Sequence, residues 1–93
     1  MKIKQLLLKG TSFRDLLKRF SLNPDEVMIK DEEVVLAELS FRQNQFLKER
    51  ICIQGKGRNG CINLFGTLYC NLINQRAVFE LDFVESHNTV SAA

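Results

Sequence analysis

One stretch of this 93-residue chain, residues 51–65, contains a possible phosphate-binding motif. Residues 55–60 read GKGRNG and match G-x-G-x-x-G, the spacing of loops that hold the pyrophosphate of dinucleotides. Such a loop needs a strand before it and a helix after it, because the helix N-terminus binds the phosphates. Residues 50–54 alternate like a strand, but residues 61–69 alternate as well and include Gly66. The stretch therefore predicts the tip of a long β-hairpin rather than a nucleotide site.

The basic side chains of this hairpin tip are the candidate contact residues. Lys56 and Arg58 would project into solvent, and Asn59 followed by Gly60 is a strong hairpin signal because both residues tolerate positive φ. Tyr69 on a neighbouring strand is placed to stack on a base or to contact a partner. A solvated, charged turn accounts for the same residues, so both interpretations stay open.

The cysteines and carboxylates offer little support for catalysis. Cys52, Cys61 and Cys70 are spaced nine apart without a C-x-x-C pair, and the single histidine, His87, lies near the C-terminus. Buried free thiols are the simpler interpretation, although three thiolates and one histidine match the ligand count of zinc. The carboxylates at 31–33 fall in an expected turn, where water solvates them. We therefore expect no enzymatic activity, no metal and no cofactor.

Composition is that of an ordinary globular domain. The chain is 45% hydrophobic and 26% charged, with a net charge of +2, which alone predicts neither nucleic-acid nor membrane binding. Its apolar runs are too short for a membrane span or a signal peptide, and three cysteines suit a reducing compartment. We expect a cytoplasmic protein with one domain at residues 1–84 and a flexible tail at residues 85–93.

The clearest structural signal is an amphipathic helix from Ser12 to Phe20. Phe13, Leu16, Leu17 and Phe20 recur at i, i+3, i+4 and i+7, which places all four on one helical face. Ser12 is expected to cap this helix.

Most of the remaining chain is expected to form strands. Residues 40–49 are ambiguous between helix and strand, and turns are expected at 31–33, near Gly66 and at 74–76. Together these elements predict an α+β fold in which the helix packs on a mostly antiparallel sheet of about five or six strands. The arrangement would be β-grasp-like or like a small β-barrel. The candidate strands are residues 2–8, 27–29, 34–39, 50–54, 61–65, 68–73 and 77–83.

Residues 11–53 resemble the sulfur-carrier proteins of thiamin and molybdopterin synthesis, which have a ubiquitin-like β-grasp fold. The resemblance rests on TSFRDLLKRFSLNPDEVMIKDEEVV at 11–35 and on FLKERICI at 46–53. It implies a short helix, a turn at Pro24 and a β-grasp sheet. Carriers of this kind act through a C-terminal Gly-Gly, whereas 33 residues follow Gly60 here. The resemblance therefore implies carrier chemistry only if the chain is cleaved.

The apolar content of residues 61–73 suggests a function. Ile, Leu, Phe and Cys occupy both faces of the expected strands there, and one helix covers only one face. We therefore expect a small non-enzymatic protein-binding module, such as an adaptor, inhibitor or assembly subunit, that uses its sheet surface or edge and forms a homodimer or binds another protein. The alternative is a small nucleic-acid-binding β-barrel that uses Lys56 and Arg58.

Overall fold

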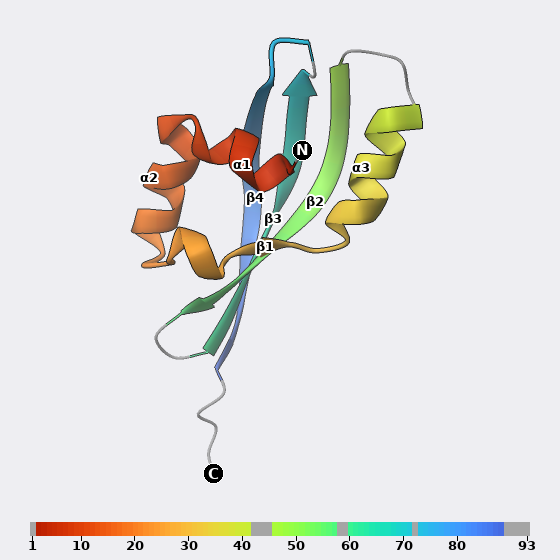
Figure 1. Cartoon of the computed structure of the whole chain (residues 1–93). Coiled ribbons are helices and arrows are strands. Elements are labelled where there is room, and N and C mark those ends of the chain that lie inside the picture. Colours follow the sequence, from red (N-terminus) through yellow and green to blue (C-terminus); the bar gives the residue numbers. More distant parts are fainter. Residues whose placement is uncertain (1, 42–45, 58–59, 72, 89–93) are drawn as a thin grey trace.

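A computed structural model describes residues 2–41, 46–57, 60–71 and 73–88, which form three helices and one four-stranded sheet (Figure 1). The sheet is antiparallel throughout, with strand order β1-β2-β3-β4, so the expected α+β class is confirmed. Four strands are found among the described residues, where we expected five or six. The elements are α1 Ile3–Leu8, α2 Thr11–Arg19, a 3-10 turn Pro24–Glu26, β1 Met28–Ile29, α3 Glu32–Phe41, β2 Phe46–Gly57, β3 Gly60–Asn71 and β4 Arg76–Asn88.

The expected helix is α2, and it begins one residue earlier than predicted. Gly10 rather than Ser12 occupies the N-cap position, with extended backbone and no side-chain cap. Residues 2–8, expected as a strand, form α1 instead. Ile3, Leu6 and Leu7 recur at helical spacing and are all buried, so this short apolar run fills the core from a helix.

The third strand expected in the first half of the chain is also a helix. Residues 34–39 belong to α3, although their branched residues favour strand. Asp31 adopts a φ of 56°, which ends β1, and its carbonyl oxygen accepts bonds from Val34 and Val35. Glu32 begins α3 and accepts a hydrogen bond from the backbone N–H of Lys4 in α1 at 3.3 Å. Local turn geometry and a contact with α1 thus outweigh strand propensity.

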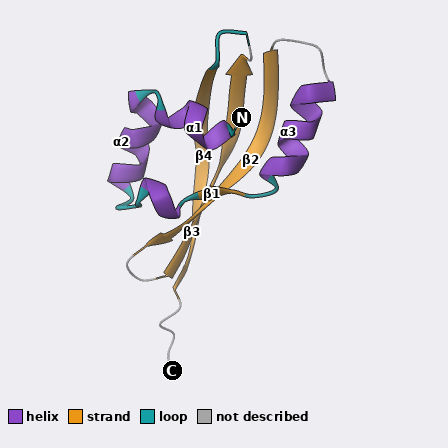
Figure 2. Cartoon of the chain, viewed as in Figure 1, coloured by secondary structure: helices purple, strands orange, loops and turns teal. Residues whose placement is uncertain are grey.

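The core lies between the sheet and helices α1 and α2, which cover one face of the sheet (Figure 2). From Leu64 to Cys70 of β3, every second residue is buried against this helical side, which gives that part of the strand its strict alternation. Phe13 of α2 meets Phe79 of β4 edge to face at 6.4 Å between ring centroids. The buried residues of β3 are Leu64, Gly66, Leu68 and Cys70.

β3 is continuous through Gly66, where we expected a turn. The register shifts there: Phe65 pairs with Phe83, whereas Gly66 pairs with Leu81. Asp82 is therefore the extra residue of a β-bulge in β4. Regular alternation along β4 would put Leu81 and Phe83 on one face, but the bulge places them on opposite faces of the sheet.

The second hairpin turn lies at residues 73–75, where we expected 74–76, because Arg76 already begins β4. The side-chain oxygen of Asn71 accepts hydrogen bonds from the backbone N–H groups of Ile73 at 3.0 Å and Asn74 at 3.1 Å. β4 then continues through Asn88, so residues 85–88 are paired with β3 rather than forming the start of the expected tail. Residues 89–93 lie outside the described part of the chain.

Candidate functional site

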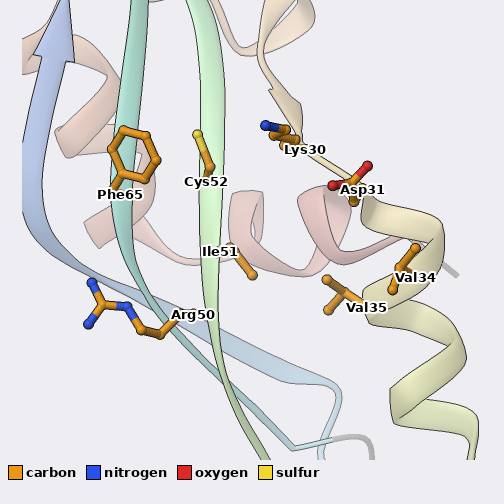
Figure 3. Close-up of a pocket in the computed structure, with 8 residues that line it drawn as sticks. All are labelled: Lys30, Asp31, Val34, Val35, Arg50, Ile51, Cys52 and Phe65. Carbon is orange, nitrogen blue, oxygen red and sulfur yellow. The ribbon is translucent and has the colours of Figure 1, made fainter.

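The sheet face turned away from α1 and α2 is the candidate site, and we call it the open face. Side chains of directly paired residues lie on the same face of the sheet, so the strand register shows which residues belong to the open face. Figure 3 shows three of these residues, Arg50, Cys52 and Phe65. The open face consists of Phe46, Lys48, Arg50, Cys52, Gln54 and Lys56 from β2; Cys61, Asn63, Phe65, Thr67, Tyr69 and Asn71 from β3; and Arg76, Val78, Glu80, Phe83 and Glu85 from β4, with Asp82 joining at the bulge.

Aromatic side chains occupy the middle of the open face. Phe65 and Phe83 stack across β3 and β4 with 4.7 Å between ring centroids and an interplanar angle of 15°. Farther along β3, the ring of Tyr69 lies 5.7 Å from the ammonium of Lys48. Phe83 is 52% exposed and Val78, which pairs with Tyr69, is 51% exposed. The open face thus presents large apolar groups that the described residues leave accessible.

Charge on the open face is divided between the outer strands. β2 contributes Lys48 and Arg50, whereas β4 contributes Glu80 and Asp82 on the other side of β3. Arg50 Nη2 and Asp82 Oδ2 form an ion pair at 2.9 Å that crosses β3. The middle of the face therefore has a basic side along β2 and an acidic side along β4, with the aromatic groups between them, whereas Arg76 places a positive charge at the start of β4.

Helix α3 borders the open face along β2. A pocket of about 300 Å³ lies between Val34 and Val35 of α3 and the side chains of Arg50, Cys52 and Phe65 (Figure 3). The pocket is lined by both the helix and the open face, so α3 forms a rim at the β2 side of that face. Along β4, the neighbouring helices are α1 and α2, which pack on the opposite, helical side of the sheet (Figure 1).

The predicted contact residues do not form one cluster. Lys56 and Tyr69 share the open face, but Tyr69 pairs with Lys48, eight positions along β2 from Lys56. That separation is about 26 Å along the strand. Arg58 and Asn59 lie outside the described residues.

The glycine motif is part of a hairpin, in agreement with the interpretation of the sequence. Gly57 pairs with Gly60, where β3 begins, so a strand rather than a helix follows the glycines. The tip is shorter than expected, because Gly55 and Lys56 already belong to β2. Gly55 is buried under Leu22 on the helical side. This geometry lacks the helix N-terminus that a dinucleotide loop requires.

The three cysteines are free thiols in different surroundings. Cys61 is exposed on the open face, Cys52 is half-buried on β2, and Cys70 is buried on the helical side. Burial raises the pKa of Cys70, and burial is also the main cause that raises the pKa of Cys52, with Lys30 opposing it. Within the described ranges, no group of three or more His, Cys, Asp or Glu side chains is arranged to hold a metal ion.

We expect Cys61 to react first with iodoacetamide in the native protein. The thiolate is the nucleophile, so a raised pKa and burial both slow Cys70, by about tenfold or more relative to Cys61. Mass spectrometry of the alkylated peptides over time at pH 7.5 measures the three rates. In denaturant the rates should converge, and equal native rates for Cys61 and Cys70 would contradict the assigned burial.

No helix in the described part of the chain has the length and apolar character needed to cross a bilayer. No protein-family model, curated protein or solved structure matches the chain. The resemblance to sulfur carriers therefore stays a prediction that these comparisons do not test.

The charged residues that face each other across the open face, Arg50 and Asp82, were not predicted from the sequence. Arg50 and Asp82 come together only through the register of two hairpins and the bulge. Counting pairs outward from Asn59-Gly60 as the two turn residues would put Arg50 opposite Tyr69, whereas the structure pairs Gly57 with Gly60 and so puts Arg50 opposite Thr67. The bulge at Asp82 has no comparable signal in the sequence.

Proposed function

We propose that this chain is a small non-enzymatic protein-binding module that acts through the open face. The observation that supports this function best is the accessible aromatic stack of Phe65 and Phe83, flanked by Tyr69 and Val78, on a face that α1 and α2 do not cover. Aromatic side chains at the centre of a surface, with charged groups around them, are typical of protein interfaces.

The face suits a partner better than the edge of β4 does. Glu80 and the bulge at Asp82 lie on β4, and charges and bulges are the features that discourage pairing with another strand. Binding through the face around Phe65 does not require backbone pairing with β4, so these features do not oppose it.

A protein also suits the open face better than a nucleic acid does. Lys48 and Arg50 would attract phosphates, but Glu80 and Asp82 on the same face would repel them. The described strands form an open sheet with β1 and β4 at its two edges, rather than the closed barrel of the alternative prediction. Three free thiols support a reducing compartment such as the cytoplasm as the place where the module acts.

Site-specific cross-linking tests the proposed function. With a photo-reactive residue at Val78, we expect a discrete cross-linked protein product in the cells that express the chain. The same residue at Arg14, which is exposed on α2, is the matched control and should give none. Absence of a product at Val78, or equal products at both positions, would overturn the proposal. Salt-sensitive binding of a mixed-sequence oligonucleotide that is lost in Lys48→Ala/Arg50→Ala would favour a nucleic-acid interface instead.

A further inference from the structure

We propose that the open face binds the open face of a second copy of this chain, with the two-fold axis parallel to β3. This inference rests on the proposed function and names its partner. In a two-fold dimer the same patch serves both copies, so the patch must complement itself. The distribution of charge and the position of α3 both select this axis.

Charge complementarity is the first argument. A two-fold axis along β3 places β2 of one copy over β4 of the other and keeps each row of side chains at the same height. Arg50, Thr67 and Glu80 form one row across the sheet, because Thr67 pairs with both of the others. The axis therefore places Arg50 over the row position of Glu80 in the second copy, beside Asp82. Each copy contributes this opposite-charge contact once, so the contact occurs twice in the dimer.

The other in-plane axis is unfavourable. An axis perpendicular to the strands places β2 over β2 and β4 over β4, so that Lys48 and Arg50 meet the same basic side, and Glu80 and Asp82 meet the same acidic side. Like charges brought together in this way disfavour the wrong arrangement. Charge alone thus distinguishes the two ways of packing these faces.

The rim formed by α3 is the second, independent argument. α3 borders the open face only along β2, where Val34 and Val35 reach the pocket beside Cys52. With the axis along β3, α3 of each copy lies outside the β4 edge of the other, where the neighbouring helices α1 and α2 pack on the opposite, helical side of the sheet. With the axis perpendicular to the strands, the α3 helices of both copies would lie along the same edge of the interface, the β2 edge.

The aromatic groups would then lie close to the two-fold axis. Packed sheets lie about 10 Å apart, a distance that interdigitated side chains fill. Phe65 and Tyr69 are on β3 itself, and Phe83 stacks on Phe65 from β4. The dimer would bury the accessible surface of these rings and of Val78, which supplies a hydrophobic centre inside the charged sides.

Charge-swapped variants test this arrangement. One variant carries Lys48→Glu/Arg50→Glu, and the other carries Glu80→Lys/Asp82→Lys. We expect the parent chain to sediment as a dimer, and each variant alone to dissociate at least about tenfold more readily because like charges would face each other. An equimolar mixture should recover the dimer, because the acidic β2 of one variant would meet the basic β4 of the other. Analytical ultracentrifugation measures all four samples.

Two controls keep the test specific. Arg14→Glu/Lys18→Glu reverses two exposed charges on α2 and should leave the dimer intact. The Arg50–Asp82 ion pair joins side chains that are 70% and 34% exposed, so its loss should leave each variant folded by circular dichroism. Phe83→Ser weakens the same interface without changing charge and should also favour the monomer.

Three results would overturn self-association. They are a monomeric parent at millimolar concentration, a mixture of folded variants that stays monomeric, and an equal loss of dimer in the α2 control. A monomeric parent that still gives a Val78 cross-link to another protein would remove the second copy as partner and keep the proposed function. If the Val78 cross-link is absent as well, both the second copy as partner and the proposed protein-binding function are overturned.

Discussion

Replacing Gly66 with alanine is expected to lower the free energy of unfolding by about 3 kcal/mol, at the upper end of the range for overpacked cores. An ideal Cβ at Gly66 would lie 2.7 Å from Cζ of Phe79 and inside contact distance of the backbone oxygen of Glu80. Neither neighbour can yield easily, because Phe79 is buried against Phe13 and the oxygen belongs to β4. Urea unfolding followed by circular dichroism measures the loss.

The other glycines supply matched controls for this substitution. A Cβ at Gly10 would meet only the carbonyl oxygen of Leu7 at 3.9 Å, and because glycine is a better N-cap residue than alanine, Gly10→Ala should cost about 1 kcal/mol or less. A Cβ at Gly55 would lie 3.0 Å from the side chain of Leu22, which can rotate, and its cost should fall between the two. Equal costs at Gly66 and Gly10 would contradict the close packing of β3 on β4.

Elements with a strong local signal could be predicted from the sequence. α2 was predicted because four apolar residues at helical spacing leave no alternative face, and the first long hairpin because Asn59-Gly60 separates two alternating runs. α1 was missed although Ile3, Leu6 and Leu7 have the same spacing, since a six-residue helix is too short for periodicity to distinguish it from a strand. α3 was missed because the turn at Asp31 and the contact of Glu32 with α1 are tertiary features.

The candidate site could be predicted only in part, for a related reason. Lys56 and Tyr69 were singled out from the sequence, and the register places both on one face of the sheet. The ideal alternation of residues 77–83 also indicated a straight strand, so the bulge that moves Phe83 to the open face was hidden. A bulge follows from how β4 fits the close approach at Gly66, and a single strand's sequence does not encode that fit. The division of charge then depends on register and bulge together.

Two adjacent residues of β3 should separate stability from binding. Leu68 is 0% exposed on the helical side, so Leu68→Ala should cost about 2–5 kcal/mol of unfolding free energy through lost burial and a cavity. Tyr69 lies on the open face beside Lys48, and Tyr69→Ala should cost about 1 kcal/mol, the loss of a partly exposed aromatic contact.

Association should show the opposite order. Tyr69 lies near the proposed two-fold axis, so Tyr69→Ala should raise the dimer dissociation constant by at least about tenfold, as the loss of a central aromatic residue does. Leu68→Ala, measured on its folded fraction, should leave that constant within about threefold of the parent, because its side chain faces α1 and α2. Urea unfolding at a concentration where the chain is monomeric gives the first quantity, and sedimentation equilibrium gives the second. If both substitutions weakened association equally, the open face would act only through the stability of the sheet, and the aromatic groups on it would not be the binding surface.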